Sequence, residues 1–294
     1  MQIGANILVQ APGDQRGDLA TAAAAIAVRS LVESDIAEHD LRLVVVANDC
    51  HGRAFEEWQR DLLAWPKLKH VTVVPTGEAS SFSHARNVAY NLMHYGHPSW
   101  DMFLEFDSDN VFPAVWFEPL MESLAGYPRA GIFSPGCIMA SHWHPVREPH
   151  IEVDYGAMHY SQIRTAVDAE AALCRRRYAG RVGVIRHPPV LKRPACLRDI
   201  GLYDEHFQGG GWEDWDENMR AASAGWEVRT FLSSFVFHWT AWEHVLLGGW
   251  QSPGGGVANR NYFFQKWPNA PAYHGAYLGA RDMVYYKPSP SPSA

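Results

Sequence analysis

The chain has 294 residues and a mass of 33.0 kDa, enough for a substantial core in one large domain or two small ones. Its formal net charge of −7 argues against general nucleic-acid binding, which needs a basic face. The four cysteines are scattered without a C-x-x-C pair, so neither a zinc site nor a disulfide framework is predicted. Because no signal peptide or membrane-spanning run is visible, we expect a soluble, cytoplasmic protein.

The first part of the chain alternates short apolar strands with helices. Strands are predicted at 7–9, 41–47, 71–74 and 102–106, and helices at 19–32, 54–63 and 83–95. This alternation indicates βαβ units and therefore an α/β fold with a mainly parallel sheet. Ligands of such sheets bind beyond the carboxyl ends of the strands. Asn48-Asp49 and Asp107-Ser108-Asp109 follow two of these strands, so we expect both to face one cleft.

The second part of the chain is less regular. A strand is predicted at 131–138, helix and irregular structure at 152–177, a helix from about 212 to 224, and a strand at 227–237 that ends at His238. The run Gly209-Gly210-Gly211 and the glycine-rich segment 248–256 are predicted to be flexible loops. The Pro/Ser-rich tail 287–294 is predicted to be disordered.

Two carboxylates at the end of the fourth predicted strand give the sharpest chemical signal. In an extended backbone, residues i and i+2 point the same way, so Asp107 and Asp109 can converge on one point. A hard cation that binds substrate phosphates takes one or two carboxylates and leaves positions open for the ligand. The alternative is an ordinary polar loop, because Asp is a common turn residue.

The order of several short motifs resembles the GT-A fold glycosyltransferases, and most closely family 2 of that group. The resemblance covers roughly residues 5 to 240, and its pieces are Asn48-Asp49, Ala85-Arg86-Asn87, Asp107-Ser108-Asp109-Asn110, Lys192-Arg193, residues 200–207, Trp212-Glu213-Asp214-Trp215-Asp216, residues 224–227 and His238. Residues 209–214 are also similar to the G-W-G-x-E-D signature of galactosyl- and N-acetylgalactosaminyltransferases. The resemblance implies one Rossmann-like GT-A domain over 1–286, with a nucleotide-sugar half near 1–125, an acceptor half near 126–286, and a smaller irregular region on the acceptor side.

The resemblance also implies a site for a nucleoside-diphosphate sugar and a divalent cation, Mn²⁺ or Mg²⁺. Asp109 would bind the cation directly, and Asp107 would bind it through water or contact the donor ribose. His238 matches the position of a third ligand, although a structural histidine is the alternative. Asp49 would accept hydrogen bonds from the base ring of the donor. Arg86 would pair with the diphosphate or with Asp107, unless it forms a plain surface salt bridge.

The resemblance places the acceptor-binding residues in the acidic run that follows the glycine loop. Asp214 would be the general base that activates the acceptor hydroxyl, and Glu213 would position the acceptor or support the loop. Trp212 and Trp215 could stack on sugar rings, with core packing as the alternative for Trp215. The acidic side chains could instead serve only to favour the dipole of the helix that they begin.

The implied function is metal-dependent transfer of a hexose or N-acetylhexosamine to an acceptor hydroxyl, with inversion favoured over retention. A nucleotidyltransferase acting on sugar phosphates is one alternative, although residues 11–17 are a poor echo of its Gly-rich loop. A catalytically inactive nucleotide- or carbohydrate-binding module is another. Eight of the 25 Lys and Arg residues, and no Asp or Glu, lie from Arg175 to Arg198. This segment could bind an anionic acceptor (acidic glycan, phospholipid or, least favoured, nucleic acid) or simply face solvent; peripheral membrane attachment stays open.

Overall fold

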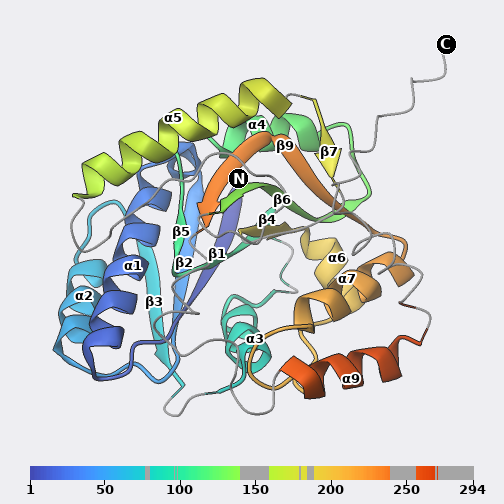
Figure 1. The fold of residues 1–294 in the computed structure, drawn as a ribbon, viewed down its shortest axis with the longest axis horizontal. Helices are drawn as coiled ribbons and strands as arrows, with labels where there is room; N and C mark the ends of the chain where they lie inside the picture. Colours follow the sequence, from blue (N-terminus) through green and yellow to red (C-terminus); the bar gives the residue numbers. More distant parts are fainter. Residues whose placement is uncertain are drawn as a thin grey trace.

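The computed structural model describes residues 1–76, 80–95, 97, 99–139, 159–178, 180–183, 189–238, 256–268 and 270. Within these residues, nine strands form one sheet flanked by helices (Figure 1). The strands are β1 (Gln2–Val9), β2 (Asp40–Ala47), β3 (His70–Pro75), β4 (Met102–Asp107), β5 (Asn110–Val111), β6 (Ala130–Met139), β7 (Val182–Gly183), β8 (Val190–Lys192) and β9 (Glu227–His238). The helices are α1 (Gln15–Val32), the short 3₁₀ helix η1 (Asp35–Glu38), α2 (Arg53–Leu63), α3 (Phe82–Leu92), α4 (Phe117–Leu124), α5 (Tyr160–Tyr178), α6 (Pro194–Ile200), α7 (Glu213–Ser223) and α9 (Gly256–Lys266).

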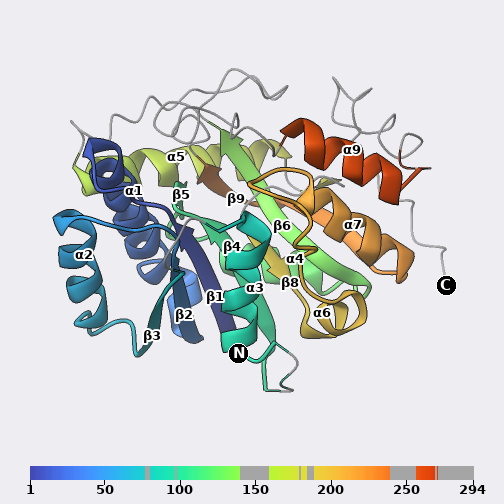
Figure 2. The same ribbon diagram turned by 90° about the horizontal axis from the view of Figure 1, so that it is seen from below.

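The first half of the sheet is parallel, in the order β3-β2-β1-β4. Alternate residues of β1 are buried on opposite faces, as expected for a parallel sheet covered by helices on both sides. Ile3, Ala5 and Ile7 join the core beneath α1, α2 and α4, whereas Leu8 packs with the core beneath α3. Figure 2 shows α3 on the opposite side of the sheet from α1 and α2. The predicted βαβ arrangement is confirmed.

The second half of the sheet is mixed. Strand β8 is antiparallel to both β4 and β6, and β9 is parallel to β6 but antiparallel to β5 and β7. Strand β5 follows the acidic pair directly, and its Asn110 lies opposite His238 of β9. This register brings the end of β9 to the end of β4, although the two strands are far apart in sequence.

Most predicted elements are present with shifted ends. Strand β1 begins at Gln2 instead of residue 7, and α1 begins four residues earlier than predicted, with Asp14 as its N-cap. Ser81 is the N-cap of α3, and its side chain accepts from the His84 amide. Sequence patterns did not predict α4, α6, α9 or the short strands β5, β7 and β8. Apart from α9, which has 11 residues, these segments have two to eight residues and carry little periodicity. The predictions for 152–158, 248–255 and 287–294 fall outside the described residues.

No helix within the described ranges combines the length and the apolarity needed to cross a membrane.

Candidate active site

Asp107, Asp109 and His238 converge where β4, β5 and β9 meet. One possible ligand atom from each residue lies within 4.8 Å of those of the other two. The Nε2 atom of His238 is 3.4 Å from Oδ2 of Asp107 and 3.1 Å from Oδ1 of Asp109. The structure therefore brings together all three residues that were expected to hold a cation.

The donor set fits a divalent cation. Asp109 is only 4% exposed, and neither of its carboxylate oxygens has an aligned hydrogen-bond donor among the described residues. The Nδ1 atom of His238 is likewise buried without a partner there. Burying a carboxylate without compensation costs several kcal/mol, so Asp109 needs a positive charge nearby, either a protonated His238 or a bound cation. A cation among these three side chains would meet that need.

The charges of the three groups are mutually dependent. Burial raises the pKa of Asp109, and Asp107 adds to this rise while His238 opposes it. Burial alone would lower the pKa of His238, but the neighbouring Asp109 and Asp107 carboxylates outweigh it and hold this pKa well above its usual value. The metal-free site thus favours a protonated imidazole beside the carboxylates.

Arg86 orients Asp107 from the opposite side. Its side chain is 1% exposed, and its Nη2 atom donates to Oδ1 of Asp107 at 2.8 Å and to the Phe106 carbonyl at 3.0 Å. Its Nη1 atom donates to Oδ1 of Asn6 at 2.6 Å. The expected pairing with Asp107 is therefore present, and it is a buried ion pair instead of a surface salt bridge. The guanidinium is held by β1 and β4 together.

Asp49 lies at the same edge of the sheet, after β2. Strands β2 and β4 flank β1, so their ends are two strand spacings, or about 10 Å, apart. Asp49 has a left-handed backbone (φ 55°), is one-third exposed, and is 3.0 Å from Nε2 of His51. The neighbouring Asn48 is buried and accepts hydrogen bonds from the Ser80 amide and the Thr76 hydroxyl, which fixes the loops around this edge. An elongated ligand could span from Asp49 to Asp107.

Glu213 and Asp214 form the first turn of α7. Glu213 is buried, and half-buried Asp214 accepts a hydrogen bond from the Trp215 amide at 2.8 Å. The ring of Trp212 packs between Trp215 and the aromatic side chains of α9. A stacking role of Trp212 toward a sugar remains a prediction.

The glycine loop links this turn to the other cluster. The Phe82 amide donates to the Gly209 carbonyl at 2.9 Å, which joins the loop to the start of the helix that carries Arg86. The N-terminal ends of α3 and α7 therefore lie on the same side of the sheet.

Comparison with known proteins gives a likeness at the level of structure alone. No protein-family model and no curated protein matches this chain. The crystal structure of S. aureus TarS 1–349 in complex with UDP-GlcNAc matches with 14% identity and a TM-score of 0.51, covering 81% of this chain and 58% of that chain. The structure of GalNAc-T7 with UDP, GalNAc and Mn²⁺ matches with 12% identity and a TM-score of 0.53, covering 92% of this chain and 51% of that chain. Both neighbours are GT-A glycosyltransferases.

The chain has the GT-A fold. In this GT-A sheet the acidic pair lies at the carboxyl end of β4, where the parallel half meets the mixed half. This chain spans little more than half the length of the two neighbours described, so their activities enter only as support for a proposal.

A buried charge cluster beneath the GT-A site was not singled out by sequence analysis. The Nζ atom of Lys192 is 2.9 Å from Oε2 of Glu105, 2.8 Å from Oε1 of Glu217 and 2.8 Å from the Tyr203 hydroxyl. Glu105 precedes Asp107 by two residues on β4, and Glu217 lies one helical turn after the start of α7. Lys192 thus ties the strand of the acidic pair to the helix of the acidic run. The sequence signal that could have predicted this cluster is Glu105, a charged residue within the apolar run 103–106.

Some charged residues of the acidic run 213–217 and of the basic segment 175–198 are buried. Asp216 and Glu217 are fully buried, so they stabilise α7 from within and cannot contact a solvent-borne substrate. Lys192 is also fully buried, and Nε of Arg193 donates to the Ala130 carbonyl. Lys192 therefore neither faces solvent nor is accessible to an anionic acceptor, the two alternatives considered for the segment from Arg175 to Arg198.

Proposed function

We propose that this protein is a metal-dependent glycosyltransferase that moves a hexose or N-acetylhexosamine from a nucleoside-diphosphate sugar to an acceptor hydroxyl. The convergence of Asp107, Asp109 and His238 at the carboxyl edge of a GT-A sheet carries the proposal. The neighbours crystallised with UDP-GlcNAc, and with UDP, GalNAc and Mn²⁺, support a UDP-sugar as donor.

Asp109, Asp107 and His238 would hold the cation in this proposal. An imidazole nitrogen beside two carboxylates favours Mn²⁺ over Mg²⁺, because Mg²⁺ prefers oxygen ligands and retains its waters. When bound, the cation would neutralise the charge that develops on the leaving diphosphate. Arg86 keeps Asp107 in place, since its guanidinium is bound to the backbone of β4 as well as to the carboxylate.

Asp49 would bind the base ring of the donor. Its distance of two strand spacings from β4 leaves room for a nucleotide whose diphosphate reaches the cation. His51, which contacts the Asp49 carboxylate, would hold that side chain in its orientation.

On the acceptor side, Asp214 would accept the proton of the attacking hydroxyl, and Glu213 would position the acceptor. We propose inversion at the anomeric carbon, because a base that activates the acceptor directly allows a single displacement. Arg176 and Arg177 in the last turn of α5 are exposed, which would suit an anionic acceptor.

The proposal is tested with two substrate panels, each with Mn²⁺ or with excess chelator. One contains nucleoside-diphosphate sugars, and the other contains nucleoside triphosphates together with sugar phosphates. We expect Mn²⁺-dependent release of a nucleoside diphosphate and free sugar from one donor, by slow hydrolysis without acceptor. Release of pyrophosphate from a nucleoside triphosphate plus a sugar phosphate would instead establish a nucleotidyltransferase. Donor binding without turnover under all acceptor conditions would establish a binding module.

A further inference from the structure

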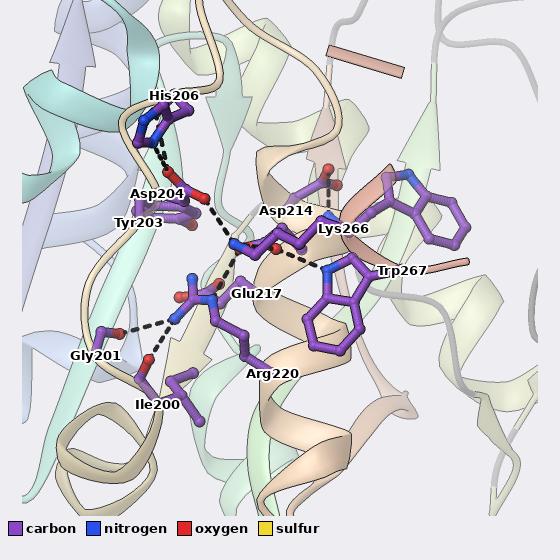
Figure 3. A network of polar contacts seen from close by, with 12 residues as sticks. Ile200, Gly201, Tyr203, Asp204, His206, Asp214, Glu217, Arg220, Lys266 and Trp267 are labelled. Atoms are coloured by element: carbon purple, nitrogen blue, oxygen red, sulfur yellow. Dashed lines mark hydrogen bonds and ion pairs between the residues drawn. The ribbon is translucent and has the colours of Figure 1, made fainter. Parts of the chain in front are cut away.

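Helix α9 packs on the segment that leads into α7. Its Tyr262 hydroxyl and Lys266 Nζ donate to Oδ2 of Asp204, at 2.8 and 2.6 Å. Lys266 also reaches Oδ1 of Asp216 on α7, at 2.8 Å, and Figure 3 shows it bridging between Asp204 and that helix. Residues 259, 262 and 266 follow each other at intervals of three and four, so they lie on one face of α9. That face is directed toward the glycine loop and α7.

Asn259 makes the most specific of these contacts. It is 2% exposed, and its Nδ2 atom donates to the carbonyls of Gln208 at 2.7 Å and Gly211 at 2.9 Å. Its Oδ1 atom accepts from the Gln208 amide at 3.0 Å. Both donors and the acceptor of the carboxamide are thus engaged with the loop backbone.

The loop needs such external support. Gly209, Gly211 and Trp212 all have left-handed backbones, with φ of 64°, 99° and 76°. For a bulky residue such as Trp212 this conformation is strained and persists only where surrounding contacts impose it. Phe263 and Phe264 of α9 pack on the Trp212 ring, with centroids 5.3 and 5.5 Å away. Glu213 and Asp214 come immediately after this strained residue.

We propose that Asn259 is a positioning residue that holds the loop 208–212 in its left-handed path, so that Asp214 begins α7 at the place the transfer reaction requires. The assignment rests on the proposed function, since it places Asn259 in the same reaction without contact to the reacting atoms. It extends the site to α9, which follows all the motifs of the sequence resemblance along the chain.

Donor binding has separate supports, which lets the two roles be distinguished. Ser81 caps α3 independently of the loop, by accepting from the His84 amide. Asn87 of α3 is held by the Tyr203 backbone and by Glu205. Loss of the Asn259 contacts should therefore leave the Arg86–Asp107 pair intact.

The test compares Asn259→Ala and Asn259→Asp with Asn261→Ala, an exposed asparagine on the same helix. Because small misplacements of a reacting group can cost about 100-fold in rate, we expect kcat of both Asn259 variants to fall by about 10- to 100-fold. The donor Kd, measured calorimetrically with Mn²⁺, should change by less than about threefold, in keeping with a loss confined to the transition state. Asn261→Ala should match wild type in both. Wild-type kcat in the Asn259 variants, or equal losses in kcat and donor affinity, would overturn the assignment.

A second measurement does not depend on turnover. Hydrogen exchange of the Gln208 amide, which Asn259 protects, should accelerate by at least about tenfold in Asn259→Ala and remain unchanged in Asn261→Ala. If wild type turns over no nucleotide sugar, the proposed function fails, while this exchange result still decides whether Asn259 holds the loop. Asn259→Asp keeps the side-chain shape and the acceptor, so it remains informative where the alanine variant does not fold. Because the Asp variant retains this acceptor, its informative readout is kcat, and unchanged Gln208 exchange in a folded Asn259→Ala protein would refute the proposed role of Asn259.

Discussion

Asn110 and His238 lie directly opposite each other in the antiparallel pairing of β5 with β9. The side chain of Asn110 also accepts a hydrogen bond from the Asp107 amide at 2.8 Å, so one residue fixes both the turn of the acidic pair and the arrival of the histidine. A strand of only two residues thus assembles the candidate metal centre. The predictions below test this centre and the groups around it.

Removal of the Asp109 charge should abolish cation binding. Asp109→Asn keeps the side-chain shape, so we expect a folded protein whose melting temperature no longer rises with Mn²⁺. In wild type, Mn²⁺ at 100 times its Kd should add about 2.7 kcal/mol of stability. Chelation should abolish activity, and Mn²⁺ should restore it. Asp61→Asn, at an exposed position of α2, is the matched control. Full activity in excess chelator would contradict the metal assignment.

Loss of the Arg86 guanidinium should both destabilise the fold and weaken the metal site. Arg86→Met leaves Asp107 and Asn6 without their buried partner, so we expect about 3–5 kcal/mol lower stability in urea unfolding and weaker Mn²⁺ binding. Arg198→Met, at an exposed position of α6, should stay within about 0.5 kcal/mol of wild type. A similarly small change for Arg86→Met would show that the buried pair is not energetically important.

Asp49→Ala should weaken donor binding with little effect on turnover, since Asp49 is expected to contact the non-reacting base. Loss of a hydrogen bond to a charged group, worth about 1.5–3 kcal/mol, predicts a donor Kd raised by about 10- to 100-fold. Calorimetry and steady-state kinetics separate the two effects. His51→Ala should give a smaller change in the same direction, because it only removes a contact to the Asp49 carboxylate. A large fall in kcat at unchanged Kd would place Asp49 elsewhere on the substrate.

Asp214→Asn removes basicity while keeping shape, so transfer should fall by about 10²–10⁴-fold. Donor binding should survive, and Asp61→Asn again serves as control. NMR of the product should show a β-linked sugar from an α-linked donor. Retained configuration would argue against a direct base and toward the N-acetylgalactosaminyltransferase-like signature that residues 209–214 partly share.

The buried Lys192 cluster should be essential to stability. Lys192→Met leaves the carboxylates of Glu105 and Glu217 without their shared cation, so we expect a loss of about 3–5 kcal/mol. Combining it with Glu105→Gln and Glu217→Gln removes the uncompensated charges and should recover part of that loss. Urea unfolding of the single and triple variants measures both. A triple variant less stable than Lys192→Met would contradict this electrostatic explanation.

Local sequence patterns determined the parallel half of the fold. Apolar runs such as Leu41 to Ala47, each followed by a helical segment, specify βαβ units, because strand and helix periodicities differ within a few residues. The same local rule predicted that Asn48-Asp49 and Asp107 lie at one edge, since parallel strands end together. These features follow from backbone conformation and side-chain periodicity, which depend on residues close together in the chain. Asp109 reaches this edge through a turn at Ser108-Asp109 and not through the extended backbone that the sequence suggested.

Tertiary structure decided the rest, because pairing and burial act between segments distant in sequence. His238 reaches the acidic pair only through the register of β5 and β9. Because β5 has only two residues, no periodicity in the sequence predicts this pairing. Lys192 belongs to a basic stretch in sequence, yet the packing of β4, β8 and α7 buries it between Glu105 and Glu217. Asn259 has no local motif around it, and its contacts exist because α9 packs on the glycine loop. Sequence alone therefore determined which residues could bind a cation, and the fold decided which groups hold them in place.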